Sequence, residues 1–168
     1  GNLITTGLVS TPSITHTGTN AVGNIGSASS YFNTVFAQAT SALYADLAEN
    51  YQADAEYEPG TVLEFGGDYE VTVATDATRR VAGVVSTNPA YKMNSGLNGN
   101  NVVALALAGR VPCKVVGIVH RGDLLVTSSV AGYAQKCTED KEDSRAVFAK
   151  ALEEKLNDGA GTIEVLVL

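Results

Sequence analysis

The first 45 residues of the chain contain no Asp, Glu, Lys or Arg, and this absence of charge limits what the segment can fold into. All 18 acidic and 11 basic residues of the 168-residue sequence lie from Asp46 onward. Apolar side chains come in short pulses, such as Leu3-Ile4, Leu8-Val9 and Tyr31-Phe32, and turn-forming Gly, Asn, Ser and Thr separate them. The pattern predicts short β-strands and turns rather than helix.

This leader cannot be expected to fold alone. Fixing a backbone costs about 1–2 kcal/mol per residue, and the few larger apolar side chains of a lone ribbon cannot offset that cost. The leader is nevertheless richer in β-branched and aromatic residues than a flexible linker. We therefore expect residues 1–42 to form the end of a β-shaft that intertwines with identical chains. The lack of charge fits this arrangement, because a charge near a symmetry axis would be repeated in every copy.

Residues 43–168 read as a compact, mainly β domain with at most short helices. Gly and Pro residues, which favour turns, separate runs rich in Val, Thr and Leu. The predicted strands are Thr61–Phe65, Tyr69–Thr75, a strand in 79–91 that stops at Asn88-Pro89, two strands in 102–117 broken near Gly109 and Pro112, a strand–turn–strand in 120–137, and Thr162–Leu168. Residues 146–157 fit a helix or a strand, and we favour a strand because the last strand needs a hairpin partner. Residues 94–101 and 138–145 are predicted loops.

Several function classes are disfavoured by composition. A net charge of −7 without a basic stripe argues against nucleic-acid binding, and no apolar run approaches the roughly 20 residues of a membrane span. His16 and His120 lie far apart, so we expect no His-based metal site, and the glycine-rich stretches lack nucleotide-binding spacing. We expect no cofactor. Cys113 and Cys137 have no CxxC spacing, so two thiols are favoured over the possible disulfide.

Two short motifs carry possible chemistry. Asp46 and Glu49 would share one face of a helical turn, with Cβ atoms about 5–6 Å apart, and proximity would separate their pKa values into an acid and a base. The same spacing is also typical of a solvated helix start with an N-cap. Arg121–Asp123 spells an integrin-binding tripeptide, but we interpret it as a tight turn before a strand.

Four stretches resemble, in order, the C-terminal domains of phage tail-fibre, neck-appendage and related virion proteins. They are ADLAENYQADAEYEPGTVLEFGGDYEVT, VAGVVSTNPAYKMN, VALALAGRVPCKVVGIVHRGDLLVTSSVAGYAQKC and FAKALEEKLNDGAGTIEVLV. The resemblance covers about residues 42–168, and it includes members of a glutamic self-cleaving peptidase family. It implies a homotrimeric fibre component of the virion, made in the cytoplasm of the bacterial host, whose C-terminal domain nucleates and registers the trimer.

The resemblance also implies a site. In self-cleaving relatives the scissile bond precedes the Asp of the D-x-x-E motif, and that Asp and Glu are the catalytic carboxylates. Carried over, the bond is Ala45–Asp46 and the pair is Asp46 and Glu49. The residue before the Asp is Ser in the cleaving pattern, whereas this chain has Ala45 and so lacks that hydroxyl.

Three functions follow as hypotheses. The leading one is a structural fibre domain that contacts other virion tail proteins, or a host-surface receptor, through loops such as 92–101 and 138–145. The second is an autopeptidase that cleaves once before Asp46. The third is a host-glycan-binding module, which would need a cluster of exposed aromatic side chains; the tyrosines of the domain are scattered in sequence, at Tyr51, Tyr57, Tyr69, Tyr91 and Tyr133.

Overall fold

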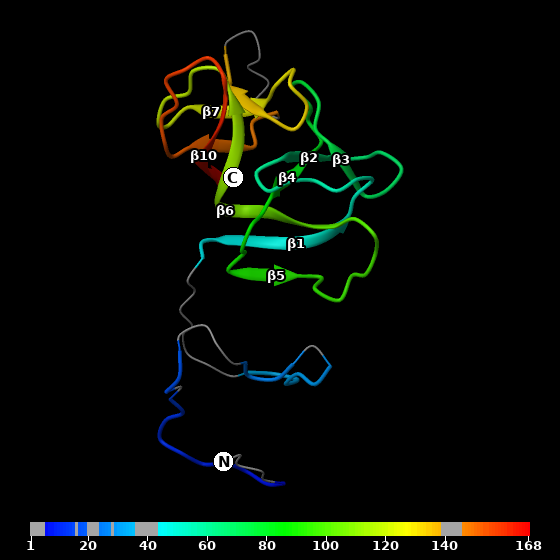
Figure 1. Cartoon of the computed structure of the whole chain (residues 1–168), viewed down its shortest axis with the longest axis vertical. Coiled ribbons are helices and arrows are strands. Elements are labelled where there is room, and N and C mark those ends of the chain that lie inside the picture. Colours follow the sequence, from blue (N-terminus) through cyan, green and yellow to red (C-terminus); the bar gives the residue numbers. More distant parts are fainter. Residues whose placement is uncertain (1–5, 16, 20–23, 28, 36–43, 139–145) are drawn as a thin grey trace. The chain divides into compact units, whose positions relative to one another are not determined.

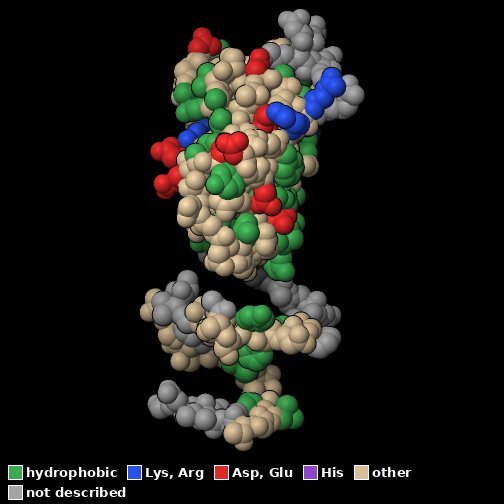
Figure 2. All heavy atoms as spheres, turned by 90° about the vertical axis from the view of Figure 1, so that its right-hand side faces the viewer, with side chains coloured by type: hydrophobic (Ala, Val, Ile, Leu, Met, Phe, Trp, Pro, Cys, Tyr) green, Lys and Arg blue, Asp and Glu red, His purple; other side chains and the backbone are tan. Residues whose placement is uncertain are grey.

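The computed structural model describes residues 6–15, 17–19, 24–27, 29–35, 44–138 and 146–168. It divides the chain into two compact units, Gly1–Thr40 and Ser41–Leu168. The predicted loop 138–145 and His16 therefore lie largely or wholly outside the described residues. Figure 2 shows charged side chains on the second unit, whereas the described residues of the first unit carry none.

The described part of the first unit buries little of its apolar surface. Leu8, Ile14 and Ile25 are 93%, 87% and 86% exposed. Its β-structure, among the described residues, is one isolated antiparallel bridge between Ser27 and Ser30. In a single chain these side chains are thus left in contact with water.

The second unit is built from strands, and its described residues contain no helix. The described residues therefore include no helix long and apolar enough to cross a membrane. The ten strands are β1 Asp46–Gln52, β2 Val62–Phe65, β3 Val71–Val73, β4 Val81–Val85, β5 Tyr91–Met93, β6 Val102–Val116, β7 Leu124–Thr127, β8 Ala134–Lys136, β9 Ala149–Ala151 and β10 Ala160–Val167. The prediction of a mainly β domain is confirmed. The residues 146–157 contain strand β9, which pairs with β10 as the hairpin interpretation required.

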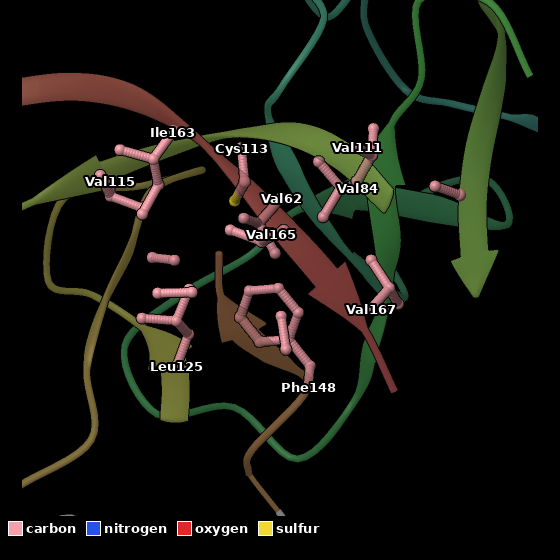
Figure 3. Packing of buried hydrophobic residues seen from close by; sticks show 14 of the residues in the cluster. Val62, Val84, Val111, Cys113, Val115, Leu125, Phe148, Ile163, Val165 and Val167 are labelled. Atoms are coloured by element: carbon pink, nitrogen blue, oxygen red, sulfur yellow. The ribbon is translucent and has the colours of Figure 1, made fainter. Parts of the chain in front are cut away.

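Five strands close on themselves to form a small barrel. The hydrogen-bonded order runs β10-β9-β7-β8-β6, and β10 also pairs with β6, which completes the ring. The barrel interior holds side chains that alternate along these strands, among them Cys113, Val115, Leu125, Ile163 and Val165 (Figure 3). A closed ring leaves no open sheet edge along these strands.

The remaining strands extend the sheet beyond the barrel. From β6 the order continues β4-β2-β3, while β1 pairs with both β6 and β5. A second apolar cluster lies here, and it contains Leu63, Val71 and Leu105 with the half-buried ring of Tyr51 against it. Figure 1 shows β6 beside β1 and then turning towards the barrel strands, so one strand serves both parts of the unit.

Strand β6 corrects one prediction. Gly109 and Pro112 were expected to break this region into two strands, but β6 runs without interruption from Val102 to Val116. Gly109 has a φ of 99° and is the point on β6 where two pairings meet. The pairing with β1 ends at Gly109 on one edge of β6, and the pairing with β10 ends there on the other edge. The missing N–H of Pro112 faces the edge that β1 has already left, since the Arg110 N–H on that edge bonds Ala45. Proline is tolerated at such an edge.

Strand β1 corrects a second prediction from the sequence. Asp46–Glu49 was expected to form a helical turn, yet these residues begin a seven-residue strand between β5 and β6. The tripeptide Arg121–Asp123 is a turn, as predicted: Gly122 has a φ of 91°, and the Asp123 carboxylate accepts a 2.8 Å hydrogen bond from the His120 N–H.

Candidate functional site

The Ala45–Asp46 peptide bond lies at the start of β1. The carbonyl of Ala45 accepts a 3.1 Å hydrogen bond from the backbone N–H of Arg110, and the carbonyl of Asp46 accepts a 2.9 Å bond from the N–H of Ala90. The first bond holds the carbonyl of the peptide group on which the sequence predicted cleavage, and the second holds the next peptide group along β1.

Gly109 makes room for this bond. A Cβ atom at Gly109 would lie 2.3 Å from the Ala45 carbonyl oxygen and 3.0 Å from the Asp46 Cα. Real Cβ atoms do not approach other heavy atoms so closely, and the backbone of Gly109 also adopts a left-handed conformation. Glycine at this position lets β6 lie directly against the predicted scissile bond.

The Asp46 carboxylate is buried, with 5% of the residue exposed. Its Oδ2 accepts a 2.6 Å hydrogen bond from the Oγ of Ser86, which is itself buried and follows β4. The site thus contains a hydroxyl beside Asp46 even though residue 45 is alanine.

Glu49 does not share the surroundings of Asp46. Residues alternate between the two faces of a strand, and three positions along β1 place Glu49 on the face opposite to Asp46. Its Oε2 accepts a 2.9 Å hydrogen bond from the Tyr51 hydroxyl. Burial, reinforced by the hydrogen bond and charge of Glu49, raises the pKa of Tyr51 to about 12, so this phenol stays protonated.

A pocket of about 230 Å³ opens at the predicted scissile bond. Ala45 and Asp46 line it, together with Arg110 from β6 and Glu164 from β10. Glu164 was not selected from the sequence, because it is remote from Asp46 along the chain. One signal was available: Glu164 is the single charged residue of the predicted strand Thr162–Leu168.

The pKa of Glu164 is raised above its ordinary value of 4.5. Burial is the largest cause, the negative charge of Glu153 adds to it, Arg110 opposes it, and the charge of Asp46 raises the pKa further. Two acidic residues thus line the pocket, and their carboxylates differ: that of Asp46 accepts a hydrogen bond from a hydroxyl, and the pKa of Glu164 is raised.

Other candidate residues serve the fold. Cys113 lies in the barrel core, where burial raises the pKa of its thiol to about 12. Tyr51 packs edge-on against Phe65, with ring centroids 5.8 Å apart, and Tyr57 donates a 2.6 Å hydrogen bond to Asp54. In the part of the chain that the structure describes, no group of three or more His, Cys, Asp or Glu side chains could hold a metal ion.

Solved structures share this architecture, whereas the sequence comparisons give no match. No family model matches the sequence, and no curated protein matches it either. Among solved structures, two of a bacteriophage phi29 protein share this fold. The chain is similar to the pre-mature gene product 12 of bacteriophage phi29, with a TM-score of 0.60 and 12% identity over 80% of this chain. It spans 23% of the length of that protein.

A second solved structure shows which region of the phi29 protein shares this fold. The C-terminal fragment of the same phi29 gene product aligns over its full length with 73% of this chain, at a TM-score of 0.53 and 12% identity. At this identity the likeness shows a shared fold. The resemblance to C-terminal domains of phage appendage proteins, predicted from the sequence, is thus confirmed at the level of the fold.

Proposed function

We propose that this chain is a structural component of a phage tail fibre or appendage, and that residues 43–168 nucleate and register its homotrimer. The observation that carries the proposal is the fold shared with the C-terminal fragment of a phage gene product. In this role the protein belongs to the virion, is made in the cytoplasm of the bacterial host, and contacts other tail proteins and a host-surface receptor.

The leader supplies the physical need for such a domain. The large apolar side chains among its described residues are exposed in the single chain, so they would gain burial by packing against copies of themselves. Repetitive, uncharged ribbons can pair in several registers of similar energy. A compact domain that associates first selects one of these registers and brings the three leaders to a common starting point.

The folded unit offers a surface suited to this association. Leu47 of β1 is 37% exposed and lies opposite Tyr91 of β5, which is 65% exposed. On its other side Leu47 lies opposite Ala108 of β6, which is also exposed. We refer to Leu47, Tyr91 and Ala108 as the β1 patch. Three adjacent strands thus present apolar side chains to solvent, and contact with a second copy would bury them.

Light scattering tests the trimer. We expect the full chain to have a mass near three times 17.4 kDa. A truncated chain that starts at Asp46 should remain an oligomer, because the proposal assigns association to the folded unit. A full chain of 17.4 kDa would refute the trimer, and a monomeric truncated chain beside a trimeric full chain would place registration in the leader instead.

A second function, a single self-cleavage at Ala45–Asp46, is favoured by the pocket at that bond. Strand β6 holds the carbonyl of this peptide group, and Asp46 and Glu164 are among the residues that line the space beside it. Asp46 and Glu49 are the pair that the resemblance implies. Denaturing mass spectrometry is the test: a fragment beginning at Asp46 supports cleavage, and chains that stay intact at every time and pH sampled exclude it.

A further inference from the structure

We propose that Asn98 and Gly99 form a site of spontaneous modification, at which the backbone nitrogen of Gly99 attacks the Asn98 side chain and converts it to aspartate and isoaspartate. The site lies in the loop 94–101, between β5 and β6 (Figure 1). Asparagine is among the thermolabile residues of proteins. The reaction needs water and no enzyme, so it does not depend on the function proposed above.

The residue that follows an asparagine decides how easily this ring closure occurs. The attacking nitrogen must carry a hydrogen and must reach the side-chain carbonyl carbon, and glycine allows this best because it has no Cβ and a freely rotating backbone. Asn98 is the one asparagine of the sequence that a glycine follows. Asn88 precedes a proline, which has no N–H, and Asn94 and Asn157 precede serine and aspartate, which carry a Cβ.

Asn98 and Gly99 are open to water and lie outside regular structure. Both residues are exposed, and neither belongs to a strand. Within the part of the chain that the structure describes, no hydrogen bond holds the Gly99 N–H. Asn50, in contrast, is buried in β1 and paired with β6, so attack there would first require the sheet to open.

The Asn98 side chain is held by its own loop rather than by a strand. Its Nδ2 donates a 2.9 Å hydrogen bond to the carbonyl of Gly96, and this bond is exposed to solvent. The Nδ2 of Asn94 instead donates a 3.0 Å bond to the carbonyl of Asn50 on β1. Asn94 is exposed like Asn98, so the two asparagines differ in their anchoring and in the residue that follows them.

The fold gives a reason for the glycine at position 99. A Cβ atom there would overlap the Oε1 of Gln52, the last residue of β1, unless that side chain moved. Glycine therefore lets the end of β1 lie against the loop. The same missing Cβ leaves the backbone of Gly99 free to turn its nitrogen towards Asn98.

The reaction balances in two steps. The Gly99 nitrogen loses its proton to solvent and bonds to the Cγ of Asn98, while the Cγ–Nδ2 bond breaks and the nitrogen leaves with a proton as ammonia. Water then opens the resulting cyclic imide at one of its two C–N bonds. Breakage at Cγ gives aspartate, and breakage at the backbone carbonyl gives isoaspartate, in which the main chain is longer by a carbon atom.

Both products change the loop. Each adds a negative charge to a chain whose net charge is already −7. Isoaspartate also lengthens a loop whose end is held to β1, because the carbonyl of Asn101 accepts a 2.9 Å hydrogen bond from the Ala53 N–H. An aged chain would therefore present a different contact loop to a tail protein or receptor, and this consequence alone rests on the proposed function.

Peptide mapping by mass spectrometry tests the site in the folded full chain. The freshly purified chain is incubated in mildly alkaline buffer, and conversion of amide to acid is followed at each asparagine. We expect Asn98 to react at least about tenfold faster than Asn94 or Asn157, a difference in barrier of about 1.4 kcal/mol. The products should include isoaspartate, detected by enzymatic methylation of its carboxylate, because direct hydrolysis of the side chain would give aspartate alone.

A pair of substitutions isolates the ring closure. Asn98→Gln keeps an amide on a longer side chain, so attack by the Gly99 nitrogen would need a larger ring, and the acid form at position 98 should no longer accumulate. The matched control Asn94→Gln should leave the rate at Asn98 within a few-fold of the unsubstituted chain. Circular dichroism and light scattering verify that both variants fold and assemble alike.

Three results would overturn the proposal. The first is a rate at Asn98 no higher than that at Asn94. The second is aspartate without isoaspartate, which would mean direct hydrolysis. The third is a rate that rises more than about tenfold when urea unfolds the chain, because the fold would then protect the site by about 1.4 kcal/mol or more.

Discussion

Gly109 matters both for the fold and for the candidate site, because β6 lies against the Ala45–Asp46 bond at this position. We expect Gly109→Ala to lower the free energy of unfolding by about 2–5 kcal/mol, because its Cβ would overlap the Ala45 carbonyl and its φ of 99° is strained for alanine. Urea denaturation measures the change. The same substitution should slow any cleavage at Ala45–Asp46, because the bond must move.

Gly117→Ala is the matched control for this substitution. Gly117 also has a left-handed backbone, with a φ of 75°, but a Cβ there would meet no heavy atom within 4 Å. The expected loss is the conformational cost alone, about 1–2 kcal/mol. Equal losses for the two variants would show that the close approach of Ala45 to β6 contributes nothing to stability.

At the scale of strands, side chains alternate between a buried and an exposed face, so adjacent residues contribute differently to stability. Leu125 and Leu124 are adjacent on β7, yet Leu125 is fully buried in the barrel and Leu124 is 44% exposed. We expect Leu125→Ala to lower the free energy of unfolding by about 2–5 kcal/mol, the usual cost of emptying a core site. Leu124→Ala should cost under about 1 kcal/mol, and similar costs in urea denaturation would contradict the barrel packing.

Strand alternation also explains how much of the fold the sequence could predict. Runs such as Thr61–Phe65 and Thr162–Leu168 carry a local period and lie on β2 and β10. The continuity of β6 could not be predicted, because Gly109 and Pro112 are tolerated only through partners that lie elsewhere in the chain. Local signals report turns, and they do not report which edge of a strand is paired.

The candidate site was predictable in part for the same reason. The sequence indicated Asp46 and the bond before it, and the structure places that bond in a pocket. The helical spacing of Asp46 and Glu49 was wrong, since β5 and β6 hold these residues in a strand and tertiary pairing overrides local preference. That Glu164 lines the same pocket could not be predicted without knowing that β10 pairs with β6.

At the scale of the whole molecule, the β1 patch gives a test of assembly. We expect Leu47→Asp to convert a trimer into single chains, because association would then bury a carboxylate without a partner. The matched control Leu156→Asp changes a 64% exposed leucine in the segment between β9 and β10, and it should leave the mass unchanged. If Leu47→Asp keeps the trimeric mass by light scattering, copies meet through another surface.

The pairing of β10 with β6 has a consequence for the timing of synthesis. The ring of the barrel stays open until Ala160–Val167 has left the ribosome, by which time the leader has long been exposed. Pairings so distant in sequence form slowly. If the folded unit registers the copies as proposed, neighbouring nascent chains align only after translation is complete, and a chain truncated before β10 should fail to assemble.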